Sequence, residues 1–213
     1  MLRFALPVVL CIASSLPAAA TSRGNFREGY QALLRRDYDK SLAYLTRAIE
    51  IGDLTRTNQA LAFHYRGALY LKRERLDEAI ADLDRALALN PRLATAYGDR
   101  GIAHRRKGDY ERAIADYGEA IRLWPEWHDW YLHRGLVFGT LGRQDEAIAD
   151  FGMALRLRPN LVNALVGRAE AYLAKGERTN AIADFRRAVA LDRDVAANYP
   201  GIAEKLARIG AVP

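Results

Sequence analysis

The chain has 213 residues, of which half are apolar and 27% are charged. This composition is that of a folded globular chain, and it excludes a disordered or collagen-like protein. The formal net charge is +6, and the charges are scattered along the chain. So small an excess favours acidic partners only weakly and is far from the basic surface that binds nucleic acids, so we expect no nucleic-acid partner.

Residues 1–20 differ in composition from the rest of the chain. Arg3 is the only charged residue among them, an apolar run from Phe4 to Ile12 follows, and the segment ends in three alanines. These features are typical of a secretory signal peptide, so we expect cleavage after Ala20. The alternative is a transmembrane anchor, but the apolar run is too short to span a bilayer.

The only cysteine, Cys11, lies inside this apolar run. A bacterial lipid-attachment site has a small residue before the cysteine, whereas Leu10 is large. We therefore expect no lipid anchor and, because the signal resembles a bacterial one, a periplasmic or secreted protein. The mature chain would then have no cysteine and no thiol chemistry.

A period of 34 residues runs through the rest of the chain. Pro91, Pro125 and Pro159 have this spacing, and each follows the apolar end of an expected helix. Small residues recur with the same period at three other places, namely Gly67, Gly101, Gly135 and Ala169; Ala79, Ala113, Ala147 and Ala181; and Ala86, Ala120, Ala154 and Ala188. Self-similarity at a fixed period of this length indicates a solenoid of stacked helical hairpins.

This pattern closely resembles the tetratricopeptide repeat family. Four good copies lie at 60–93, 94–127, 128–161 and 162–195, and a weaker copy at 22–55 is followed by a four-residue insertion, Arg56–Gln59. The resemblance implies an all-α, right-handed superhelical solenoid of about five helix–turn–helix repeats. We expect residues 196–213 to form a capping helix and tail, because terminal repeats need a cover for their apolar face.

Glycines mark the turns inside three of the expected hairpins. Gly108, Gly142 and Gly176 each follow an expected first helix. Glycine is favoured where a helix ends in the left-handed conformation, so these three residues are predicted to end the first helices.

An arginine and an aspartate recur sixteen residues apart in the four good copies. The pairs are Arg66 and Asp82, Arg100 and Asp116, Arg134 and Asp150, and Arg168 and Asp184. In an antiparallel hairpin these places lie roughly opposite each other, so we expect ion pairs between the two helices. The alternative is a ladder of arginines that binds an anionic ligand, but a carboxylate in every copy favours the structural interpretation.

The sequence offers little for catalysis or metal binding. No two of the four histidines have the i, i+4 spacing of a helical metal pair, and there is no G-x-S-x-G, P-loop or G-x-G-x-x-G motif. His104 replaces a packing aromatic of the family, so we expect it in the core. The sequence thus predicts no metal, no cofactor and no enzyme, with catalysis a remote alternative.

All three tryptophans, Trp124, Trp127 and Trp130, fall within seven residues at the junction of the copies 94–127 and 128–161. Packing of the seam between repeats explains one or two of them. Three together exceed that need, and clustered exposed aromatic side chains are typical binding anchors. Both interpretations stay open at this point.

The resemblance also implies a binding groove, because the family binds peptides on the concave face that its first helices line. The residues at the corresponding places are His64, Tyr65, Lys72, Asp99, Arg105, Arg106, Leu132 and His133. The carboxylate-clamp subclass places lysine and asparagine at sites that are here Phe26, Tyr30, Tyr65, Thr95 and Asp99, so that clamp is absent.

The expected function is a non-catalytic scaffold or adaptor of the bacterial cell envelope. Lys72, Arg105 and Arg106 bring positive charge to the expected groove and Asp99 moderates it, so we expect a weakly acidic peptide or protein partner with apolar anchors. The alternative is a regulatory subunit that modulates an envelope protease or a cell-wall hydrolase. One scaffold serves many partners, so the partner, the pathway and the oligomeric state do not follow from the sequence.

Overall fold

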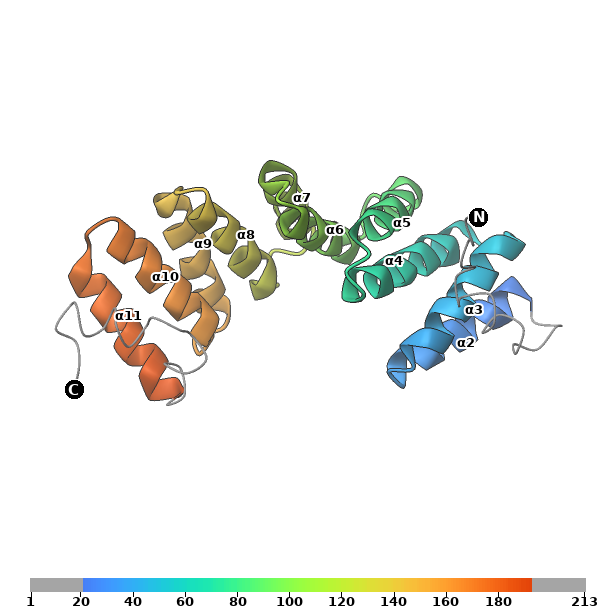
Figure 1. Cartoon of the computed structure of the whole chain (residues 1–213), viewed down its shortest axis with the longest axis horizontal. Coiled ribbons are helices and arrows are strands. Elements are labelled where there is room, and N and C mark those ends of the chain that lie inside the picture. The colour runs from blue at the N-terminus through green and yellow to red at the C-terminus, as the bar shows by residue number, and fades with distance from the viewer. Residues whose placement is uncertain (1–20, 193–213) are drawn as a thin grey trace, which may run out of the picture. The chain divides into compact units, whose positions relative to one another are not determined.

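The computed structural model describes residues 21–192 (Figure 1). Their regular elements are ten helices: α2 (Ser22–Leu34), α3 (Tyr38–Ile51), α4 (Arg56–Lys72), α5 (Leu76–Leu89), α6 (Ala94–Lys107), α7 (Tyr110–Leu123), α8 (His128–Thr140), α9 (Gln144–Leu157), α10 (Val162–Ala174) and α11 (Arg178–Leu191). No strand occurs in this part of the chain, so the all-α prediction is confirmed. The expected signal peptide and the expected capping helix lie outside the described residues.

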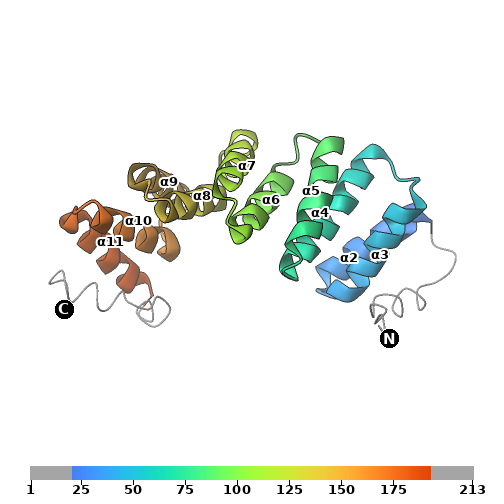
Figure 2. The ribbon, with the colours of Figure 1, turned by 45° about the horizontal axis from the view of Figure 1, so that its top comes forward.

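The chain divides into two compact units between Lys107 and Gly108. In the first unit α2 packs on α3, α3 on α4, α4 on α5 and α5 on α6, and α4 also contacts α2 and α6. In the second unit α7 packs on α8, α8 on α9, α9 on α10 and α10 on α11. Within each unit, antiparallel helices thus follow one another in series (Figure 2).

The four-residue insertion lengthens a helix. α4 begins at Arg56 and has 17 residues, whereas every other helix has 13 or 14. The Thr55 side chain caps it by accepting a hydrogen bond of 3.3 Å from the Asn58 backbone N–H. The insertion therefore forms an extra helical turn at the start of the second hairpin.

The turns between paired helices use the left-handed conformation throughout. Gly108, Gly142 and Gly176 have φ values of 83°, 73° and 80°, which confirms the prediction from the sequence. At the corresponding places of the first two hairpins, Arg36 and Glu74 adopt φ values of 61° and 58°. The fold imposes this conformation even on residues with a β-carbon, for which it is unfavourable.

Large and small side chains interlock between the helices. In the second unit the Phe151 ring lies between α8 and α10, against Gly135 and Gly167. A β-carbon at Gly167 would sit 2.5 Å from Phe151 Cζ, and one at Gly135 would sit 3.0 Å from Phe151 Cε1. Phe151 is 2% exposed. The missing β-carbons therefore let both first helices approach one buried ring.

The arginine–aspartate pairs tie the two helices of a hairpin together. Arg66 donates two hydrogen bonds to Asp82, of 2.7 and 2.8 Å, and Arg134 with Asp150 and Arg168 with Asp184 have the same arrangement. All three aspartates are buried. Arg100 and Asp116 belong to different units, so this fourth pair stays a prediction.

The same arginines reach the second helix of the preceding hairpin. Arg66 Nη1 donates to Thr46 Oγ1 of α3 at 3.4 Å, and Arg100 Nη1 pairs with Asp84 of α5 at 2.6 Å. In the second unit Arg134 lies against Gly118, where a β-carbon would sit 3.7 Å from Nη1. These arginines thus lie against the preceding hairpin, and Arg66 and Arg134 also pair within their own.

Hydrogen bonds keep these arginines charged. Burial is the largest single influence on Arg66 and disfavours its charged guanidinium, but the hydrogen bonds to Asp82 and the attraction of nearby negative groups, Asp82 first, together outweigh it and raise the pKa of Arg66. For Arg134, the hydrogen bonds to Asp150 are the largest cause of a raised pKa.

We expect Arg134→Leu to destabilise the fold by about 2–4 kcal/mol, because it leaves the buried Asp150 without its partner. The double change Arg134→Leu with Asp150→Leu should recover much of this loss. The matched control is Arg122→Leu, which breaks an exposed pair with Glu119 and should change stability by less than about 0.5 kcal/mol. Urea unfolding followed by circular dichroism measures all three. An Arg134→Leu variant as stable as wild type would refute a structural role for the pair.

Two glycine substitutions in the second unit should have opposite effects. Gly152 lies in the middle of α9, and a β-carbon there would meet its nearest atom, Arg168 Nη1, at 3.8 Å, so Gly152→Ala should stabilise by about 0.5–1 kcal/mol. Gly167→Ala should destabilise by about 1–3 kcal/mol, because the buried Phe151 ring has no room to move away. Thermal unfolding of both variants tests this, and equal shifts in the same direction would contradict the packing described here.

Candidate protein-binding surfaces

The first helices of the first unit, α2, α4 and α6, contribute one continuous set of side chains, which we call the first-helix face. It contains six of the residues predicted for the groove: His64, Tyr65, Lys72, Asp99, Arg105 and Arg106. α4 contacts both α2 and α6, so these helices lie side by side. The structure thus brings these six residues together within one unit.

Three aromatic rings form the centre of this face. The Tyr65 ring of α4 stacks on Tyr30 of α2 at a centroid distance of 5.3 Å and on Phe26 at 6.3 Å. Tyr30 is 37% exposed, and Phe26 and Tyr65 are half-buried. Burial, with a smaller contribution from Tyr30, raises the pKa of the Tyr65 hydroxyl, so this ring stays neutral at physiological pH. The cluster has the apolar area and polar tips typical of binding anchors.

His64 and Asp99 form a polar link beside the aromatic cluster. His64 Nε2 of α4 lies 2.9 Å from Asp99 Oδ2 of α6. His64 is buried and its ring also contacts Tyr65, at a centroid distance of 5.4 Å. This bond between neighbouring first helices fixes the orientation of a ring that supports Tyr65, so we assign both residues a supporting role.

The cations of this face are partly compensated by the chain itself. Arg106 pairs with Glu74 at 2.6 Å and donates to the Leu71 carbonyl at 3.2 Å. Lys72 Nζ lies over the Tyr38 ring, 4.6 Å from its centroid. Arg105 is half-buried. The positive field is therefore weaker than the sequence indicates.

Two residues predicted for the groove lie in the second unit. Leu132 is 5% exposed and belongs to the apolar core around Phe151, so the expectation that it lines an open groove is wrong. His133 stacks on Tyr117 at a centroid distance of 5.8 Å. Neither residue shares a unit with the first-helix face.

The three tryptophans divide into one buried and two exposed residues. Trp130 is 7% exposed, whereas Trp124 and Trp127 are 41% and 38% exposed. The Trp124 and Trp127 rings lie 4.7 Å apart, and Trp127 also stacks on His128 at 6.0 Å with nearly parallel planes. Trp130 therefore packs in the interior, and the other two form an exposed aromatic patch before α8, for which a role as binding anchors stays a prediction.

Other functional groups are sparse among the described residues. They contain no group of three or more histidine, cysteine, aspartate or glutamate side chains placed to hold a metal ion. None of the helices between residues 21 and 192 is long and apolar enough to cross a membrane. His104 is buried.

Two family models of the tetratricopeptide repeat match the sequence, one over residues 67–130 and the other over 132–196. The chain belongs to the tetratricopeptide repeat family. Tetratricopeptide repeats are generally non-catalytic protein-interaction modules, so the class of this protein is that of a protein-interaction scaffold. No curated protein sequence matches the chain.

Several solved tetratricopeptide repeat structures share the fold. MamA is 23% identical with a TM-score of 0.72, over 84% of this chain and 95% of MamA. A tetratricopeptide repeat protein from Parabacteroides merdae ATCC 43184 is 20% identical with a TM-score of 0.75, over 89% and 74% of the two chains. YrrB, described as having an unusual peptide-binding site, is 17% identical with a TM-score of 0.70, over 88% and 94%. At these identities the likeness shows the fold alone.

The sequence pattern alone does not place Phe26 and Tyr30 on a binding surface. Both were noted only as replacements for carboxylate-clamp residues of the tetratricopeptide repeat family. Their i, i+4 spacing on the first helix is the signal that places two aromatic rings on one helix face. Predicting their contact with Tyr65 would also require the register between α2 and α4. The insertion after the first repeat obscures that register.

Proposed function

We propose that the chain is an exported, non-catalytic adaptor that binds a peptide or protein segment on the first-helix face of its first unit. The observation that carries this proposal is the stacked cluster of Phe26, Tyr30 and Tyr65. The family is one of protein-interaction modules, and YrrB, which shares the fold, has a peptide-binding site.

The contacts of this face define the partner's chemistry. Rings that are already stacked lose little conformational freedom on binding. Apolar side chains of a partner can therefore bury surface against them at a low cost in conformational entropy. The cations Lys72, Arg105 and Arg106 outnumber the single acid Asp99, although Glu74 neutralises Arg106. A weakly acidic segment with apolar anchors fits this balance better than a polyanion does.

The proposed place of action is the bacterial cell envelope. Residues 1–20 have the features of a signal peptide, and α2 begins just after them, with the Thr21 side chain accepting a hydrogen bond of 3.0 Å from the Gly24 N–H. Cleavage after Ala20 would leave this cap intact. The alternative is a regulatory subunit of an envelope protease or cell-wall hydrolase, which would use the same face.

Truncation of Tyr65 tests the binding face. We expect Tyr65→Ala to reduce affinity for a captured partner by about 1–3 kcal/mol, because an aromatic anchor at the centre of an interface contributes that much. The matched control is Tyr44→Ala, which removes a similarly half-buried ring from the second helix α3. Affinity capture from an envelope fraction with each variant, followed by mass spectrometry and titration of the captured partner, measures the difference.

The exposed tryptophans supply the competing site in this experiment. Trp127→Ala should leave the captured partner unchanged, provided that each variant keeps wild-type helicity. If Trp127→Ala loses the partner and Tyr65→Ala retains it, the binding surface is the tryptophan patch and the first-helix proposal fails.

Export predicts a defined N-terminus. Full-length protein expressed in a bacterial host and recovered from the periplasm should begin at or near Thr21 and carry no lipid, and Ala20→Leu should accumulate as precursor because the cleavage site needs a small residue. N-terminal sequencing and intact-mass measurement test this. A product that starts at Met1, or that carries lipid on Cys11, would show the proposal to be wrong.

A further inference from the structure

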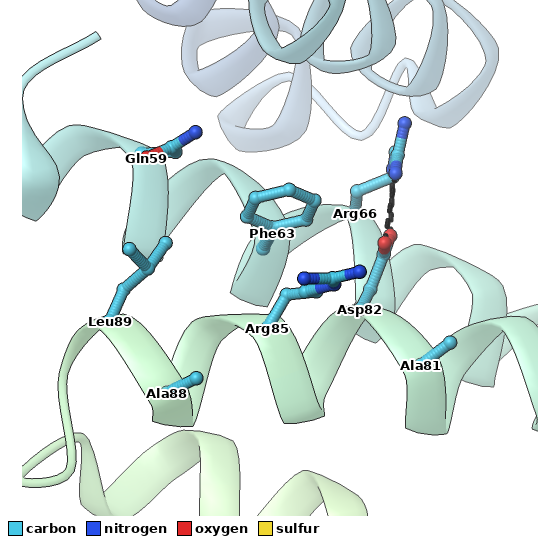
Figure 3. Close-up of a pocket in the computed structure, with 8 residues that line it drawn as sticks. All are labelled: Gln59, Phe63, Arg66, Ala81, Asp82, Arg85, Ala88 and Leu89. Atoms are coloured by element: carbon cyan, nitrogen blue, oxygen red, sulfur yellow. Dashed lines mark hydrogen bonds and ion pairs between the residues drawn. The ribbon is translucent and has the colours of Figure 1, made fainter. Parts of the chain in front are cut away.

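A hollow of about 510 Å³ lies between α4 and α5, away from the first-helix face. α4 turns by about 100° per residue, which places Gln59, Phe63 and Arg66 on the side opposite Tyr65 and Lys72. Figure 3 shows these three side chains beside the hollow, with the Arg66–Asp82 pair joining α4 to α5. The α5 residues that line it are Ala81, Asp82, Arg85, Ala88 and Leu89.

The extra turn of α4 helps to form this hollow. Gln59 belongs to that turn, and Arg56 at its start donates from Nε to the Leu89 carbonyl at 2.9 Å, which joins the start of α4 to the end of α5. On α5 the small side chain of Ala88 leaves the space open. The corresponding place in α7 is occupied by Arg122, which pairs with Glu119.

Arg85 carries an uncompensated positive charge at this hollow. It is exposed and makes no ion pair with any residue between 21 and 192. The acids of α5 are all engaged elsewhere, Asp77 by Lys107, Glu78 by Arg75, Asp82 by Arg66 and Asp84 by Arg100. α4 contains no acidic residue. Glu50 of α3 attracts Arg66. One guanidinium is thus left to pair with an anion from outside.

Both helices also contribute apolar side chains to the hollow around Arg85. Phe63 packs against the core residues Leu83, Ala86 and Leu87, which fixes its ring beside the opening. Ala88 and Leu89 continue this surface along α5. A ligand that fits must therefore combine a single negative charge with a large apolar group. The volume is that of a small-ligand site, sufficient for the end of a chain and too small for a folded element.

We propose that this hollow binds the C-terminal carboxylate of a partner peptide whose last residue is large and apolar. A C-terminal residue carries its carboxylate and its side chain on the same Cα, so the carboxylate pairs with the Arg85 guanidinium while the side chain contacts Phe63 and Leu89. A planar guanidinium can bind a carboxylate through two parallel hydrogen bonds. This site is separate from the first-helix face and does not depend on it.

The probe is a fluorescein-labelled peptide that ends in Leu-Phe with an unblocked carboxylate, titrated into the full chain and followed by fluorescence anisotropy. We expect the C-terminal amide of the same peptide to bind about tenfold or more weakly, because a hydrogen bond to a charged group contributes at least that factor. Arg85→Leu should weaken binding of the carboxylate peptide by a similar factor and have little effect on the amide.

Two further variants separate the site from general effects of charge and folding. Ala88→Phe fills the hollow from an exposed helix position and should abolish binding without loss of helicity. Arg187→Leu removes an exposed arginine at the corresponding place of α11, where it donates to the Pro159 carbonyl, and should leave binding unchanged. Tyr65→Ala should also leave it unchanged, which distinguishes this site from the first-helix face.

Several outcomes would overturn the proposal. Equal affinity for the carboxylate and the amide, an unchanged affinity in both Arg85→Leu and Ala88→Phe, or no binding at millimolar peptide would each refute it. N-acetyl-phenylalanine that competes as strongly as the whole peptide would show that the occupant is a small organic acid instead. Loss of binding in Tyr65→Ala alone would move the peptide to the first-helix face.

Discussion

The fold depends on buried aspartates that need an arginine from the neighbouring helix. Asp82 lies in the interior of a hairpin, where an unpaired carboxylate would be strongly unfavourable. Arg66 satisfies both of its oxygens and also reaches Thr46 of α3, so one guanidinium contacts three successive helices. Packing reinforces the short distance between α4 and α5, because Gly67 has no side chain and lets α4 contact Leu83 of α5. The register of each hairpin and its distance from the preceding one are therefore coupled.

This coupling leaves α4 with two sides that we propose as binding surfaces. One side carries Tyr65 between the rings of α2 and the His64–Asp99 link to α6. The other side carries Phe63 and faces Arg85 across the hollow. Between these sides α4 packs through its small residues, including Ala60 and Gly67, which are buried. The same buried packing therefore positions the side chains on both sides of the helix.

The recurring features were predictable from the sequence, and the departures from the repeat were not. The paired helices, the left-handed glycines such as Gly142, and the arginine–aspartate spacing all follow from the period. Arg36 adopts a left-handed conformation that is unfavourable for a residue with a β-carbon, and α4 has an extra turn. Neither feature follows from the 34-residue period. Leu132 was misassigned because a helix pattern gives the direction of a side chain, whereas its exposure depends on what packs against it. The hollow at Arg85 was missed for the same reason.

The distribution of charge pairs explains why the two sides of α4 suit different ligands. A carboxylate needs a cation that the chain has not already paired. On the first-helix face Arg106 is engaged by Glu74 and Lys72 lies on the Tyr38 ring, while the places of the family's carboxylate clamp hold the rings of Phe26 and Tyr30. That face therefore favours apolar side chains along a segment. Arg85 has no ion-pair partner among residues 21–192, so the proposed recognition of a chain end fits the opposite side, where one charge and one apolar wall meet.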